Sequence, residues 1–76
     1  MKEVYVFAGL DFDTSTRAGA EGFFQVAWLK QQDDDGNETD ISDRIYGGRH
    51  YCSEDELAET LVSVLKATVH LETEPA

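Results

Sequence analysis

The chain has 76 residues, enough for one domain, and a domain this short buries only about 60% of the surface that its unfolded chain exposes. Its 41% apolar content exceeds that of a disordered tail, yet no apolar run approaches the roughly 20 residues of a membrane-spanning helix. The formal net charge of −10, from 16 acidic and six basic residues, repels nucleic acid and anionic membranes and attracts basic surfaces.

Residues 3–12 alternate with a period of two, which predicts a β-strand. One face carries Val4, Val6, Ala8, Leu10 and Phe12, and the other carries Tyr5, Phe7, Gly9 and Asp11. Residues 14–22 are mostly small and polar, with glycines at positions 19 and 22, and they predict a loop or a wide hairpin connection.

Residues 23–31 alternate again and predict a second strand. One face of this strand carries Phe24, Val26 and Trp28, and the other carries Phe23, Gln25, Ala27 and Leu29. We expect Trp28 to pack in the core. Apolar residues also occur on the second face of both strands, so we expect protein to cover part of that face too; they are Tyr5, Phe7, Phe23 and Leu29.

The run from Asp33 to Glu38 is rich in residues that favour turns, and it should close a second hairpin. A third strand is expected from about Ile41 to Cys52. Gly47 and Gly48 weaken that strand in the middle. They predict a bulge or a close backbone approach that divides the strand into two short pieces.

Ser53 predicts the start of a helix, since its hydroxyl can cap the amide of Glu56 while the Glu56 carboxylate reaches back. The helix then begins at Glu54 and carries one apolar stripe, made of Leu57, Leu61, Val64, Leu65 and Thr68. Residues 68–71 either prolong this helix or form a short fourth strand. Residues 73–76 have nothing to bury and should form a frayed tail.

These elements predict a single α+β domain over residues 1–72. In it, an antiparallel meander of three strands, or four, packs against one amphipathic helix. No signal-peptide pattern opens the sequence, and the single cysteine excludes an intramolecular disulfide. We therefore expect a cytoplasmic protein.

Residues 31–42 resemble an EF-hand calcium loop in part, with oxygen-bearing side chains at loop positions three, five and nine and a glycine at position six. The likeness fails at the first and last loop positions, which contribute strongly to calcium affinity, because Gln31 replaces the first Asp and Ser42 replaces the bidentate Glu. The flanks also predict strands where an EF-hand has helices. We expect an acidic hairpin turn and no metal site.

His50 and Cys52 lie two apart on the expected third strand, so an imidazole beside a thiol is conceivable. No further residue orients the histidine, and the nearby carboxylates oppose thiolate formation. His70 would add a third zinc ligand, but the spacing is not a recurrent zinc pattern. We expect no catalytic residue, no cofactor and no enzyme activity.

Ten of the 16 acidic residues fall within residues 33–59. Closely spaced carboxylates on a rigid body imitate the phosphates of duplex DNA, which cationic channels bind chiefly through charge. Aromatic residues often dominate the energies of interfaces. We therefore expect a partner-binding surface made of Asp33, Asp34, Asp35, Glu38, Asp40, Asp43, Glu54, Asp55, Glu59, Tyr46 and Tyr51.

By size and charge alone, and by no motif, the chain is similar to the small inhibitors of phages and mobile elements, which include DNA mimics and anti-CRISPR proteins. The similarity implies a protein-binding inhibitor of a basic, nucleic-acid-handling partner, with no direct binding of nucleic acid or membrane. One alternative is a non-enzymatic adaptor or subunit that forms a homodimer through its sheet edge. Another is that the charge serves only solubility.

Overall fold

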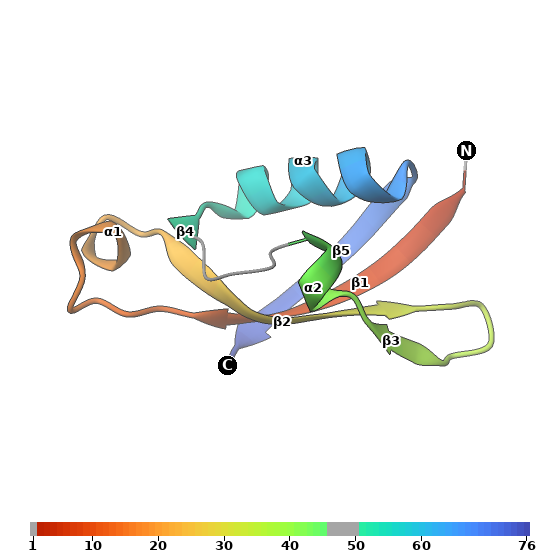
Figure 1. The fold of residues 1–76 in the computed structure, drawn as a ribbon, viewed down its shortest axis with the longest axis horizontal. Coiled ribbons are helices and arrows are strands. Elements are labelled where there is room, and N and C mark those ends of the chain that lie inside the picture. The colour runs from red at the N-terminus through yellow and green to blue at the C-terminus, as the bar shows by residue number, and fades with distance from the viewer. Residues whose placement is uncertain (1, 46–50) are drawn as a thin grey trace.

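A computed structural model describes residues 2–45 and 51–76 of the chain. Within these residues, five strands form one sheet and the longest helix lies on one of its faces (Figure 1). The elements in chain order are β1 (Glu3–Asp11), α1 (Arg17–Ala20), β2 (Phe24–Gln32), β3 (Glu38–Asp40), α2 (Ser42–Ile45), β4 (Tyr51–Cys52), α3 (Glu54–Leu65) and β5 (Thr68–Pro75).

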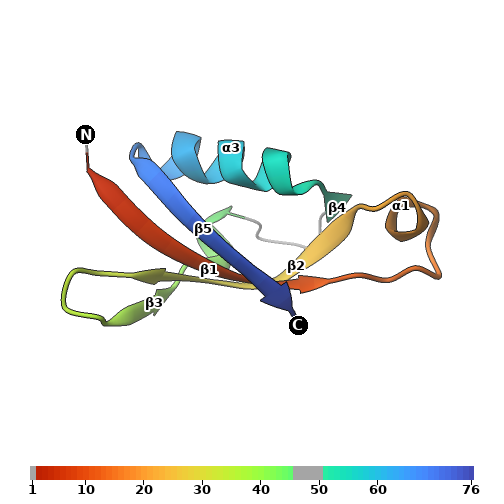
Figure 2. The same ribbon diagram turned by 180° about the vertical axis from the view of Figure 1, so that it is seen from behind.

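The main path of the sheet runs in the order β3-β2-β1-β5, and β4 pairs with the start of β2. β1 is antiparallel to β2 and parallel to β5. The predicted α+β class and the helix on one face agree with this arrangement, but the sheet is not a simple antiparallel meander. Helix α3 carries the chain back to the end where β1 begins, so β5 must run parallel to β1 (Figure 2).

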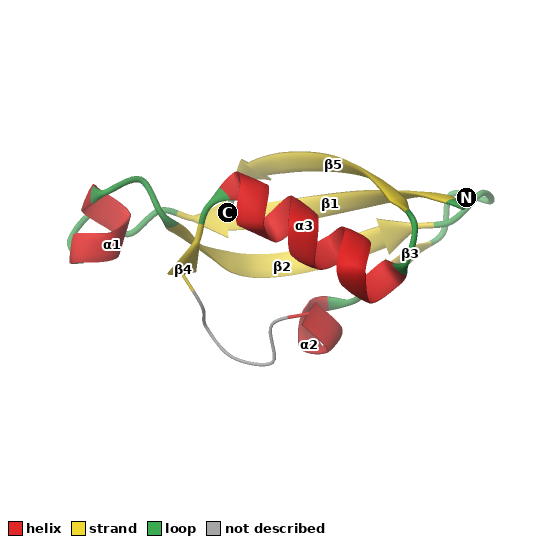
Figure 3. Ribbon diagram, turned by 90° about the horizontal axis from the view of Figure 1, so that it is seen from above, coloured by secondary structure: helices red, strands yellow, loops and turns green. Residues whose placement is uncertain are grey.

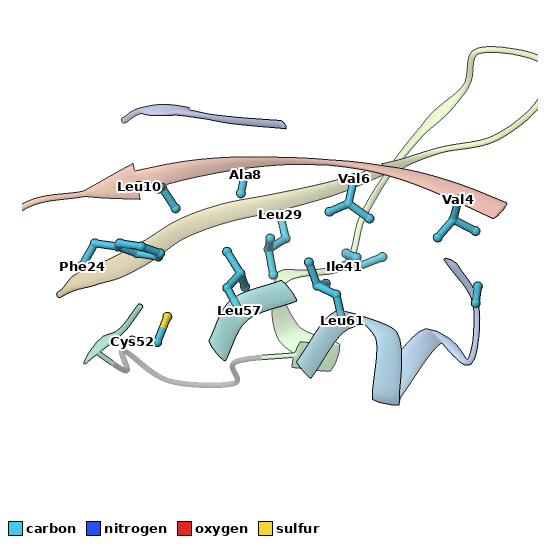
Figure 4. Packing of buried hydrophobic residues seen from close by; sticks show 11 residues of the cluster. Val4, Val6, Ala8, Leu10, Phe24, Leu29, Ile41, Cys52, Leu57 and Leu61 are labelled. Carbon is cyan, nitrogen blue, oxygen red and sulfur yellow. The ribbon is translucent and has the colours of Figure 1, made fainter. Parts of the chain in front are cut away.

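The core lies between α3 and the facing side of the sheet (Figure 4). Leu57 and Leu61 of the helix are fully buried against alternate residues of β1 and against Leu29 of β2. Alternation along β1 holds as predicted for its first four apolar positions. The buried cluster comprises Val4, Val6, Ala8, Leu10, Phe24, Leu29, Ile41, Cys52, Leu57, Leu61 and Ala67.

A β-bulge in β2 overturns the predicted position of Trp28. Gly9 lies opposite Trp28 whereas Leu10 lies opposite Val26, so Ala27 is an extra residue on the β2 side of the pair. An extra residue shifts the alternation by one position. Leu29 therefore joins Phe24 in the core, and Trp28 turns to the opposite face instead of packing beside Phe24.

The segment after Asp40 does not continue as a strand. Ser42–Ile45 is a short helix, and Asp40 Oδ1 accepts the amide of Ser42, its first residue, at 2.8 Å. The Ser42 hydroxyl accepts the amide of Leu29 at 2.9 Å, which holds this turn against β2. The prediction of a strand over residues 41–52 is thus wrong for Ser42–Ile45, which form α2. Among the described residues it is right only for Tyr51–Cys52, which form β4. The predicted break at residues 47–48 lies outside the described residues.

The loop predicted over residues 14–22 contains the four-residue helix α1. Its first turn is capped by Thr16, whose Oγ1 accepts the amide of Gly19 at 3.0 Å. A single capped turn needs few apolar residues, which explains why no periodic pattern marks it.

Helix α3 begins at Glu54, as predicted, and Ser53 Oγ accepts the amide of Glu56 at 3.3 Å. The predicted apolar stripe holds at Leu57 and Leu61 but not at Val64, which is exposed. The helix ends at Leu65, and its C-cap, Lys66, has a left-handed backbone with φ of 52°. None of the described helices is long and apolar enough to cross a membrane.

The end of the chain forms a strand where we expected a frayed tail. Residues 68–71 belong to β5, which continues to Pro75, and the amide of Ala76 donates to the Leu10 carbonyl at 2.8 Å. Main-chain pairing with β1 orders this segment although most of its side chains are exposed. A hydrophobicity pattern cannot reveal pairing of this kind.

Replacing Ser53 with Ala should lower the free energy of unfolding by about 1 kcal/mol, because the amide of Glu56 loses its side-chain acceptor. Chemical denaturation of the variant and the parent measures the difference. Ser63→Ala is the matched control, since Ser63 is exposed within α3 and caps nothing. Equal midpoints for Ser53→Ala and Ser63→Ala would contradict the role of the cap.

Candidate interaction site

Helix α3 carries the first group of predicted partner-binding carboxylates. Glu54, Asp55 and Glu59 are exposed, while Leu57 and Leu61 of the same helix are buried in the core. Asp55 and Glu59 are four residues apart and therefore lie side by side on the helix, where like charges destabilise it slightly. The surface is thus strongly anionic at some cost to the helix.

The turn between β2 and β3 carries the second group. All three of its aspartates are exposed, but they differ in role. Asp33 Oδ1 accepts the amides of Asp35 and Asn37, each at 2.9 Å, and so shapes the turn itself. The carboxylates of Asp34 and Asp35 are therefore the two whose removal tests charge without removing that support.

Three further predicted residues lie beside the turn or on α2. Glu38 Oε2 lies 4.0 Å from Lys30 Nζ. Asp40 is engaged by Ser42, whose side-chain and backbone hydrogen bonds lower the pKa of the Asp40 carboxyl below its ordinary value. Asp43 is exposed in the first turn of α2.

The structure separates the acidic residues into two groups. The turn projects from one end of the sheet, whereas the acidic residues of α3 lie over the sheet near β4 (Figures 1 and 3). Tyr46 lies outside the described residues. Tyr51 is half-buried in β4, and its hydroxyl oxygen lies 3.1 Å from Thr16 Oγ1, so it supports α1.

The residues considered for metal or thiol chemistry do not come together in the described chain. Cys52 is fully buried in the core, opposite Phe24. His50 lies outside the described residues, and His70 is on β5, where its Nε2 donates to Glu3 Oε1 at 3.0 Å. Across residues 2–45 and 51–76, no group of three or more His, Cys, Asp or Glu side chains is placed to hold a metal ion.

The side of the sheet away from α3 is a candidate surface that our prediction of partner-binding residues did not include. The helices of the described chain leave this open face uncovered (Figures 1 and 2). By register, it carries the odd-numbered residues of β1 and their neighbours on the adjoining strands, with Tyr5 51% exposed. Its members include Tyr5, Phe7, Trp28, Lys30, His70, Glu72 and Glu74.

The signal for this surface was present in the sequence. Tyr5 and Phe7 occupy the second face of the first strand, where we expected protein to cover them. No helix of the described chain packs on this face, so the apolar rings stay accessible. Trp28 joins them only because of the bulge at Ala27, which the alternation pattern could not predict.

Trp28 lies flat across the backbone of Gly9. A Cβ added at Gly9 would be 2.2 Å from Trp28 Nε1, which is far inside van der Waals contact. Glycine is thus required at this position by the close approach of the indole ring. The contact fixes Trp28 as part of the surface of the sheet.

Comparisons of the chain with protein-family models, with curated proteins and with solved structures found no match.

Changing Gly9 to Ala should lower stability by about 1–3 kcal/mol, because the added methyl group forces the indole away from the sheet. Trp28 is the only tryptophan, so its fluorescence should also shift to longer wavelength as the ring enters water. In a Trp28→Ala background, Gly9→Ala should cost far less. Equal costs in the two backgrounds would show that the ring does not lie over Gly9.

Proposed function

We propose that this protein is a non-enzymatic inhibitor that occupies a cationic nucleic-acid-binding site on a partner protein. The observation that carries the proposal is the set of exposed carboxylates on α3, with Glu54 at its first turn and Asp55 and Glu59 one turn apart on its outward face. A net charge of −10 on so small a body adds a field that draws in basic surfaces.

The acidic turn adds a second anionic group, separate from that on the helix. Asp34 and Asp35 are held outward by a turn whose geometry Asp33 maintains. A carboxylate fixed in position loses less freedom on binding than one on a flexible tail. Two rigid acidic groups on one body suit a basic channel that would otherwise hold a nucleic-acid backbone.

A second candidate function, an adaptor that forms a homodimer through its sheet, is favoured by the position of β5. This eight-residue strand pairs with β1 on one side and forms an edge of the described sheet. Glu72, Glu74 and Pro75 are, however, of the types that natural edge strands use against edge-to-edge pairing. Two copies that each carry a charge of −10 also repel, so we place the inhibitor first.

Neutralising either acidic group should weaken capture of a nucleic-acid-binding protein from lysate while the fold persists. The variants are Asp34→Asn with Asp35→Asn, and Glu54→Gln with Asp55→Asn and Glu59→Gln. Each exposed pair contributes little alone, so the combined changes should weaken binding by roughly three- to tenfold or more. Quantitative mass spectrometry of the captured proteins, with circular dichroism of each variant, measures both effects.

Glu21→Gln is the matched control, because it removes an exposed carboxylate that belongs to neither group. The captured protein should be released by added duplex or guide nucleic acid and by salt, since a mimic and its model compete for one channel. If both multiple variants bind like the Glu21→Gln control and nucleic acid releases nothing, the charge serves only solubility.

A further inference from the structure

The open face repeats one local arrangement, in which a nitrogen-bearing side chain stacks on an aromatic ring and also meets a carboxylate. Lys30 Nζ lies 5.3 Å from the centre of the Trp28 ring and 4.0 Å from Glu38 Oε2. On the same face, the His70 ring stacks on Tyr5 with centroids 4.8 Å apart, and it donates to Glu3.

Within the described residues, the ring of Phe7 has carboxylates beside it but no nitrogen-bearing side chain stacked on it, since Lys30, its neighbour across β2, lies over Trp28 instead. Phe7 lies opposite Glu72 of β5, and Gly9 lies opposite Glu74, so both carboxylates share the face of the ring. Within the described residues, no basic side chain forms an ion pair with Glu72 or Glu74. Phe7 is half-buried, and both glutamates are exposed.

A shallow hollow marks this position on the surface. It has a volume of about 260 Å³ and crosses the sheet from β5 to β3. Phe7 and Trp28 form its aromatic part, with Glu72 and Glu74 towards one edge and Glu38 towards the other. Lys30, which pairs with Glu38, also lines the hollow. The hollow is therefore aromatic at its centre, anionic at the β5 edge and occupied by an ion pair at the β3 edge.

We propose that this hollow binds an arginine side chain of a basic protein partner, stacked on Phe7 and paired with Glu72 and Glu74. A cation over an aromatic ring is attracted by the negative face of the ring. Arginine fits better than lysine, because its planar guanidinium can stack while its fork of donors reaches carboxylates at the edge. The proposal rests on the proposed function only in taking the partner to be basic.

Charge decides among the other occupants of an aromatic sheet face. A nucleic acid would stack its bases on such rings, but its phosphates would be repelled by the carboxylates of this face, which outnumber Lys30. These carboxylates belong to Glu3, Glu38, Glu72 and Glu74. A second copy of the chain brings the same excess of negative charge. A basic segment of a different protein is complementary in both respects.

The test titrates the isotope-labelled full chain with two short peptides of equal length and charge, one of Arg-Gly-Gly repeats and one of Lys-Gly-Gly repeats. Amide shifts and the Trp28 indole signal, followed by NMR, report where each peptide binds. We expect the largest shifts at Phe7, Trp28, Glu72 and Glu74, and tighter binding of the arginine peptide. A single-stranded DNA of similar length should shift none of these signals.

Two variants separate stacking from charge. Phe7→Leu keeps an apolar side chain but removes the ring, and it should lower the affinity for the arginine peptide by roughly two- to fivefold. Glu72→Gln with Glu74→Gln should lower that affinity by roughly three- to tenfold. Glu21→Gln removes an exposed carboxylate that neither lines the hollow nor belongs to the acidic groups, and it is the control, with little effect expected.

The proposal is overturned if the shifts map to α3 and the turn, or if the two peptides bind equally and Phe7→Leu changes nothing. Shifts at α3 and the turn would leave the proposed function standing, because they would assign basic ligands to its surface. Conversely, the variants of α3 and of the turn could leave capture of a partner unchanged while Phe7→Leu abolishes it. That result would support binding at the hollow and reject the proposed nucleic-acid mimicry. DNA that shifts Phe7 and Trp28 would assign the face to nucleic acid instead.

Discussion

The pairing of β1 along both of its edges fixes the arrangement of the other elements. β1 is antiparallel to β2 on one side and parallel to β5 on the other. Its side chains alternate, so the same strand supplies Val4, Val6 and Ala8 to the core and Tyr5 and Phe7 to the open face. A slip of one residue would exchange the two sets. The buried cluster and the exposed rings are two results of one register.

The acidic groups and the open face act over different ranges. Exposed carboxylates on α3 and in the turn attract a basic surface from a distance and increase the rate of encounter, although salt screens them. A ring such as that of Phe7 distinguishes one basic side chain from another only at contact, because stacking depends on geometry. In the proposed binding of a basic partner, the acidic groups supply general attraction and the open face supplies the selective contact.

The sequence predicted the elements that follow a strict period or a capping rule. Alternation located β1, and Ser53 located the start of α3. It could not predict the bulge at Ala27, because one extra residue leaves local composition unchanged while it reverses the face of Trp28. β5 was underestimated for a related reason, since parallel pairing with β1 depends on backbone groups that no side-chain pattern reports. The sequence also assigned the acidic residues to a turn and to the start of a helix, but the distance between these two groups required the three-dimensional arrangement.

The parallel pairing of β5 with β1 also orders events during synthesis. Residues 3–11 are synthesised before the other strands, yet their partner on one edge is the last strand of the described fold, residues 68–75. Until that strand arrives, β1 presents unpaired backbone groups, and such an edge is a template for association with other chains. The nascent chain therefore depends on its hairpin with β2 and on its own negative charge to stay apart from its neighbours. A segment with few buried side chains completes the fold and closes that edge.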